Sequence, residues 1–232
     1  MKTSLSTRAR SLQAAVGSLF CVALSGQAAA AVVDSAGDHF SVYFNGIVHG
    51  TEQAGLTASA DFTLTGIDSD AFGTQTWTFD IALNNTSSSP ITSSRVSVLG
   101  FNLSSGPDFR DSSVSGELDN IGRGHMPLAG WLDLCLKGSD GWRNCAGGGG
   151  AGVLQGDSED LTLSLSFDSE LSQLELSDFF VRYQSIGGLS RCQSSGVGVG
   201  SEVPVPAAGW LMGTALLGLA GMSRGRGART AA

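Results

Sequence analysis

Two cysteines near the middle of the chain are spaced so that a disulfide could join them. Cys135 and Cys145 enclose nine residues, and Gly138 and Gly141 make that loop easy to close. In the chain-entropy model such a bridge stabilises the fold by about 2–3 kcal/mol. We therefore predict a Cys135–Cys145 disulfide, which leaves Cys192 over; the alternative is that Cys192 pairs with one of the other two.

Two tryptophans lie next to or within this cysteine loop. Trp131 precedes Cys135, and Trp142 lies inside the loop. An exposed indole ring can stack on the apolar face of a sugar ring, so the pair is a candidate sugar-stacking surface. Packing into the core is the alternative role for both residues. Exposure of both on one face would favour the sugar-binding role.

The residue types used in catalysis are present, but not in a recognisable arrangement. The β-domain, residues 32–202, contains no G-x-S-x-G nucleophile elbow. His39, His49 and His125 could each act as a base, yet none has a local partner pattern. A glycosidase pair cannot be picked out of 21 acidic residues without geometry. We therefore expect that the protein is not an enzyme.

Two acidic clusters are candidate ligands for Ca²⁺. The first is Asp68-Ser69-Asp70, and the second is Asp157-Ser158-Glu159-Asp160. Neither has the ligand series of an EF-hand, and an ordinary solvated turn explains both more simply. The chain has no C-x-x-C pair and its histidines are scattered. We expect no metal site or cofactor, with Ca²⁺ as the one candidate.

Charge is unevenly distributed along the chain. The net charge at pH 7 is −8, yet six of the 13 basic residues lie near the two ends, and all 21 acidic residues lie between Asp34 and Glu202. Residues 32–202 therefore carry a net charge of −14. A body this acidic repels nucleic acid and anionic lipid, so we predict no nucleic-acid partner.

The body alternates between apolar and polar residues, which is typical of strands with one buried face. We expect strands at Phe40–Phe44, Phe62–Leu64, Trp77–Leu83, Arg95–Leu103, Leu161–Phe167 and Phe179–Ile186. Turn-forming clusters separate them, at Asn84–Pro90, Ser104–Asp108 and Gly138–Gly141. Asp111–Gly156 is the least strand-like region, and Glu170–Phe180 could hold a helical turn instead. The pattern predicts an all-β fold, an antiparallel β-sandwich of jelly-roll-like or Ig-like form.

Residues 1–31 have the parts of a secretory signal peptide. A positively charged segment comes first, and residues 14–24 are apolar but too few to span a bilayer stably. The positive residues are Lys2, Arg8 and Arg10. Small residues follow, so cleavage after Ala30 or Ala31 is expected. We predict export by the Sec machinery and cleavage by signal peptidase.

A second apolar segment lies near the C-terminus. It follows a proline-containing stretch that opposes helix formation, Val203-Pro204-Val205-Pro206-Ala207. Residues 207–222 carry no charge, and a helix of that length spans roughly 24 Å, close to the thickness of a bilayer. Three cations follow: Arg224, Arg226 and Arg229. They predict a transmembrane helix with its C-terminus in the cytoplasm and the body in the periplasm.

The order of these C-terminal features resembles the PEP-CTERM sorting signal. Val203–Ala207 is similar to its V-P-L-P-A variant, and Gly209-Trp210-Leu211 also fits the family. The resemblance implies recognition by an exosortase, a membrane cysteine peptidase or transpeptidase of Gram-negative bacteria that make extracellular polysaccharide. The cysteine and glycine segment from Leu134 to Gly149 is similar to the cistern-type members. A plain tail anchor without processing is the alternative.

These features divide the chain into a signal peptide (1–31), a β-domain (32–202) and a sorting tail (203–232). The first hypothesis is a non-enzymatic structural or surface protein, held briefly at the inner membrane and then passed to the cell surface or extracellular matrix. The second is a carbohydrate-binding module for extracellular polysaccharide. The third is an enzyme on extracellular polymer, which clustering of His125 with acids in a pocket would favour.

Overall fold

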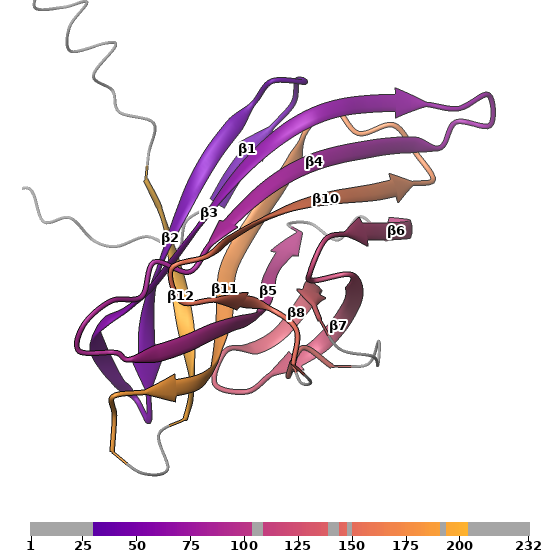
Figure 1. Cartoon of the computed structure of the whole chain (residues 1–232). Coiled ribbons are helices and arrows are strands. Elements are labelled where there is room, and N and C mark those ends of the chain that lie inside the picture. The colour runs from indigo at the N-terminus through magenta and orange to yellow at the C-terminus, as the bar shows by residue number, and fades with distance from the viewer. Residues whose placement is uncertain (1–29, 104–108, 139–143, 148–149, 191–193, 204–232) are drawn as a thin grey trace, which may run out of the picture.

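The computed structural model describes residues 30–103, 109–138, 144–147, 150–190 and 194–203, which form twelve β-strands (Figure 1). They are β1 (Ala30–Val33), β2 (His39–Val48), β3 (Thr51–Ser69), β4 (Gln75–Asn84), β5 (Ser93–Leu103), β6 (Phe109–Ser115), β7 (Asn120–Met126), β8 (Gly130–Lys137), β9 (Val153–Leu154), β10 (Ser158–Phe167), β11 (Leu174–Gly187) and β12 (Ser195–Val203). Within these ranges, no helix is long and apolar enough to cross a membrane. The predicted transmembrane helix at 207–222 and residues 1–29 of the predicted signal peptide lie outside the described residues.

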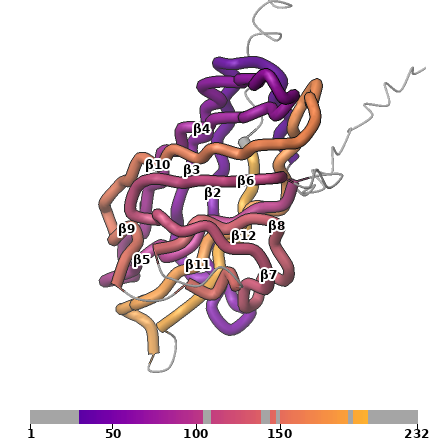
Figure 2. Tube along the Cα trace, turned by 90° about the vertical axis from the view of Figure 1, so that its right-hand side faces the viewer, coloured from indigo at the N-terminus to yellow at the C-terminus, as the bar shows by residue number. Residues whose placement is uncertain are grey.

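The strands form one continuous antiparallel sheet. Its order is β6-β10-β4-β3-β2-β12-β11-β5-β8-β7, with β1 added to β11 and β9 added to β5. The sheet curves round until its two edges approach each other, and both views place β6 between β10 and β7 (Figures 1 and 2). The guanidinium carbon of Arg123 on β7 lies 5.3 Å from the ring centroid of Phe109 on β6, which closes the gap with a cation–π contact.

The prediction of an all-β, antiparallel fold is confirmed, and every strand expected from alternation occurs within β2, β3, β4, β5, β10 or β11. The arrangement differs from the expected sandwich. A jelly-roll-like or Ig-like sandwich has two stacked sheets, whereas here the strands form a single hydrogen-bonded sheet with β6 at one edge and β7 at the other. Alternation identifies the buried face of a strand but not its neighbours, so it could not give this order.

Two local predictions were wrong. Asp111–Gly156, expected to be the least strand-like region, contains β7, β8, β9 and most of β6. Four consecutive residues of β8, Leu134 to Lys137, are buried, so the strand lacks the alternation that reveals a half-exposed strand. Glu170–Phe180 holds no helical turn, because β11 begins at Leu174.

Aromatic residues from distant strands meet inside the curved sheet. The rings of Phe40 and Phe62 stack with centroids 4.8 Å apart, and Phe62 meets Phe101 at 5.9 Å and Phe179 at 5.5 Å. These residues belong to β2, β3, β5 and β11, so the cluster joins both sides of the curved sheet. We call the side of the sheet that carries this core the inner face, and the opposite side the outer face.

Strand β12 lies between β2 and β11 and has glycines at alternate positions. A Cβ atom on Gly198 would lie 2.5 Å from Val181 Cγ2 and 2.9 Å from Tyr183 Cε2, and one on Gly200 would lie 2.7 Å from Phe179 Cβ. The glycines therefore make room for large core residues of β11, a close approach that any other residue would block.

Candidate functional site

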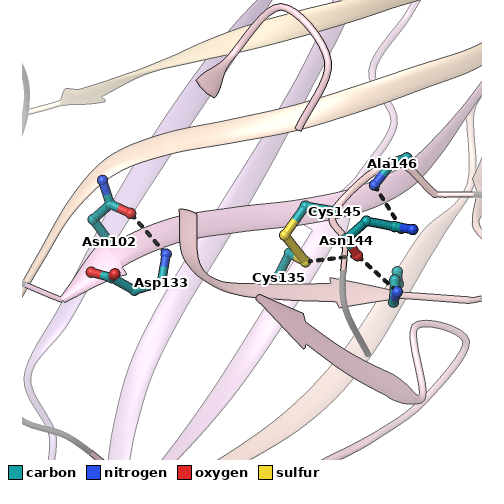
Figure 3. Close-up of a disulfide and its surroundings, with 7 residues drawn as sticks. Asn102, Asp133, Cys135, Asn144, Cys145 and Ala146 are labelled. Atoms are coloured by element: carbon teal, nitrogen blue, oxygen red, sulfur yellow. Dashed lines mark hydrogen bonds between the residues drawn. A yellow bond between two sulfur atoms is a disulfide. The ribbon is translucent and has the colours of Figure 1, made fainter. Parts of the chain in front are cut away.

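The predicted disulfide is present and buried. Cys135 on β8 is joined to Cys145, with the two Cα atoms 5.8 Å apart and no exposed surface on either residue (Figure 3). The pairing expected from the nine-residue spacing is confirmed. Cys192 lies outside the described residues.

The bridge holds residues 144–147 over the outer face of β5, β7 and β8, which we call the covered face. A second small core lies there, separate from the aromatic core of the inner face. Its buried members are Val98, Met126, Leu132, Cys135, Cys145 and Val197. A Cβ on Gly122 would lie 2.9 Å from the carbonyl oxygen of Asn144 and 3.1 Å from Cys135 Sγ, so the segment packs directly on β7.

A buried cation lies beside the bridge. Lys137 has no exposed surface, and its Nζ donates a hydrogen bond of 2.8 Å to the carbonyl oxygen of Asn144. Burial lowers the pKa of Lys137, because a desolvated ammonium group is disfavoured. The interaction ties the covering segment to β8 and assigns this lysine a structural role.

Polar side chains also fasten β5 to β8 near the bridge. Asn102 Oδ1 accepts a hydrogen bond of 2.9 Å from the backbone N–H of Asp133 (Figure 3). In return, Asp133 Oδ2 accepts one of 3.1 Å from the N–H of Leu103. These exchanged bonds continue the strand pairing where the backbone ladder ends at Phe101 and Leu134.

The structure places one of the two predicted sugar-stacking residues. Trp131 at the start of β8 is 69% exposed and lies opposite His125 of β7, which is also exposed. Trp142 lies outside the described residues. Clustering of His125 with acidic residues in a pocket would have favoured an enzyme. In the structure, His125 is exposed to solvent opposite Trp131.

A different histidine shares a hollow with acidic residues. His39, Asp38 and Glu202 line a depression of about 560 Å³ beside β1. Hydrogen bonds from the N–H groups of Asp34 and Ser35 lower the pKa of Asp38. Burial raises the pKa of Glu202, whose Oε1 has no hydrogen-bond partner among the described residues. Sequence reasoning did not identify Glu202, because this residue joins Asp38 and His39 only through the pairing of β12 with β2.

The acidic clusters considered for Ca²⁺ have structural roles. Asp70 Oδ1 accepts hydrogen bonds from the N–H groups of Phe72 at 2.8 Å and Thr74 at 2.9 Å, which shapes the β3–β4 turn. Glu159 Oε1 accepts one of 3.1 Å from the N–H of Glu117. In the described part of the chain, no group of three His, Cys, Asp or Glu residues is arranged to hold a metal ion.

The predicted sorting residues lie almost entirely outside the described ranges. Val203 is the last residue of β12 and pairs with Ser41 of β2. The others are Pro204, Val205, Pro206, Ala207, Arg224, Arg226 and Arg229. Comparison with protein-family models, with curated protein sequences and with solved structures gave no match.

Proposed function

We propose that this chain is an exported protein of the cell envelope or extracellular matrix with a non-enzymatic, structural or surface role. The signal peptide would direct it through the Sec machinery, and the tail would hold it at the inner membrane until an exosortase processes it. The body would then act at the cell surface or in the matrix.

The observation that carries this proposal is a buried disulfide in an acidic all-β body bounded by two export-type segments. Disulfides of this kind persist in oxidising compartments such as the periplasm and the extracellular space. The two segments also join the body near each other, because Ala30 of β1 and Glu202 of β12 line the same hollow. This placement supports an orientation in which the side of the body with both junctions lies next to the membrane and the other sides are exposed to solvent.

Intact-mass analysis of the full chain expressed in a host with an exosortase tests the proposal. We expect loss of the segment from Arg224 to Ala232, together with loss of the signal peptide. The same chain in an exosortase-deficient strain, and a Pro204→Ala/Pro206→Ala variant in the competent strain, are the controls and should keep the arginines. Retention of Arg224 to Ala232 by the unmodified chain in the competent host would overturn the sorting proposal.

A carbohydrate-binding role is the second candidate, and the exposure of Trp131 favours it. A largely exposed indole on a hairpin of the rigid sheet can stack on a sugar ring without rearrangement. Binding of the exported protein to extracellular polysaccharide, lost in Trp131→Ala, would support this surface. Binding that is unchanged by this substitution would exclude Trp131 as the platform.

A further inference from the structure

Apart from Ile47 and Val197, which pack in the core of the covered face, the outer face of β2, β3, β4, β10 and β12 differs chemically from the rest of the molecule, and we call it the open face. Its side chains are mostly hydroxyl and amide groups, as in the pair Thr76–Ser166 at 2.9 Å, with a few carboxylates, such as Asp80, which accepts a hydrogen bond of 3.0 Å from Thr162 Oγ1. These five strands contain no lysine or arginine. The described cations lie on β5, β6, β7, β8 and β11 instead: Arg95, Arg110, Arg123, Lys137 and Arg182.

One aromatic ring stands on this polar surface. Tyr43 of β2 is 52% exposed, although it lies in the middle of the sheet. Its direct cross-strand neighbours are Ser201 on β12 and Ser59 on β3. Both are too small to cover a phenol ring, so the ring stays open to solvent.

Tyr43 borders a shallow depression of about 510 Å³ that holds no charged residue. Its other principal lining residues are Asn45, Thr57, Thr86, Val199 and Ser201. Val199 is 41% exposed and extends the apolar surface beside the ring. The depression therefore combines the exposed apolar surfaces of Tyr43 and Val199 with neutral polar groups, which we call the rim.

The rim groups are held in place by bonds within the protein. Thr86 Oγ1 donates to Thr57 Oγ1 at 3.0 Å, and Thr57 Oγ1 donates to the carbonyl oxygen of Thr86 at 3.0 Å. Asn45 Oδ1 accepts a hydrogen bond of 3.4 Å from the N–H of Val199, and its amide nitrogen makes no hydrogen bond to the described residues. A ligand would thus meet fixed donors and acceptors at low entropic cost.

The charge pattern identifies the class of ligand. These strands contain no lysine or arginine that could pair with a carboxylate, sulfate or phosphate group of a ligand. The carboxylates of Asp61, Asp80 and Asp160, on β3, β4 and β10, would repel an anionic ligand. Neutral sugars need what the depression offers, namely an aromatic face for their C–H groups and uncharged hydrogen-bonding partners for their hydroxyls. The shallow, open shape suits an internal segment of a chain rather than an enclosed small molecule.

We propose that the open face binds a neutral polysaccharide, with Tyr43 stacked on one sugar ring and Asn45, Thr57 and Thr86 bonded to its hydroxyl groups. This site lies on a different part of the sheet from Trp131 and does not depend on Trp142. The inference goes beyond export and sorting, which could hold without any glycan ligand.

Affinity electrophoresis of the exported protein tests the site, using gels that contain dextran, hydroxyethylcellulose or galactomannan, and alginate as the anionic comparison. We expect retardation by at least one neutral polymer and none by alginate. Tyr43→Ala should weaken binding by at least about tenfold, and Tyr43→Trp should preserve it. Asn45→Ala should weaken it by about two- to tenfold, the effect of losing one hydrogen bond.

Trp131→Ala is the matched control, because it removes an exposed aromatic residue from the other surface. Retardation by none of the three neutral polymers, retardation by alginate, or loss of binding in Trp131→Ala but not in Tyr43→Ala would each overturn the proposal. Thermal unfolding of every variant shows that the fold is intact. Intact mass measured on the same samples reports export and processing separately, so a failed glycan site leaves that proposal standing.

Discussion

The open face and the covered face are two parts of the outer side of one sheet, and they differ in how they meet solvent. On the open face, polar residues alternate with core residues, and the polar side chains are exposed to water. On the covered face, Val98, Met126 and Leu132 are apolar, and a segment fixed by the Cys135–Cys145 bridge keeps them dry. A strand buried on both sides needs a cover, and here a covalent link holds the cover in place.

The largest expected effect comes from a substitution in the aromatic core of the inner face, which lies beneath both the open and the covered face. Phe62→Ala should lower the free energy of unfolding by about 3–5 kcal/mol, because it empties the centre of the aromatic cluster. Thr63→Ala, on the open face next in sequence, should change it by less than about 0.5 kcal/mol. Urea denaturation measures both values. Similar losses in the two variants would mean that the faces are not divided as described.

Removal of the bridge should weaken the covered face selectively. Cys135→Ala/Cys145→Ala should cost about 2–4 kcal/mol of unfolding free energy. In hydrogen exchange, amides of β5 and β8 should lose protection before those of β3 and β4, because only the former strands lie under the tethered segment. Uniform loss of protection across the sheet would contradict a local role for the bridge.

A single added methyl group should distinguish the faces. Gly122→Ala should destabilise by about 1–3 kcal/mol, since the new Cβ would lie 2.9 Å from Asn144 O and 3.0 Å from Lys137 Cε. Gly66→Ala on β3 is the control, because its Cβ would meet only Asp68 Oδ2 at 3.6 Å, an ordinary contact. Thermal denaturation of the pair reads out the difference, and equal effects would argue against tight packing under the cover.

The smallest expected effect concerns Glu202 of β12, which lies in the hollow beside β1. Burial raises its pKa above that in the unfolded chain, so ionised Glu202 destabilises the fold and its stabilising protonated form is lost as pH rises through the raised pKa. Glu202→Gln should therefore be more stable than the unmodified protein at pH 7, and the difference should shrink as pH falls toward 4.5. Asp34, Asp38 and His39 line the same hollow and are present in both proteins. A pH-independent difference, measured by urea denaturation across this range, would rule out this titration.

The same division explains what the sequence could predict. Strands of the open half, such as Trp77–Leu83 in β4 and Leu161–Phe167 in β10, were predicted because one face meets water and the alternation is visible. In β8 both faces are buried, so that signal is missing. The disulfide was predictable from spacing alone, since a short loop limits the distance between its ends.

The candidate site was less accessible to sequence reasoning. Tyr43 lies between Val42 and Phe44, and alternation alone places it on the outer face. What could not be foreseen is that Ser201, 158 residues away in sequence, would lie beside it through the pairing of β12 with β2. Strand order depends on the packing of the whole sheet, and that information is not present in any local stretch of sequence.

Strand β12 also has a mechanical consequence. It is hydrogen-bonded on both sides, to β2 over Val197–Val203 and to β11 over Ser195–Val199, and it ends at Val203, where the proposed sorting tail would begin. Antiparallel hydrogen bonds run perpendicular to their strands, so a pull on the tail along the strand axis loads them in shear and all together instead of one at a time. A body tethered through β12 would therefore unfold under such a pull only at a higher force than one tethered through an edge strand, whose hydrogen bonds can break one after another.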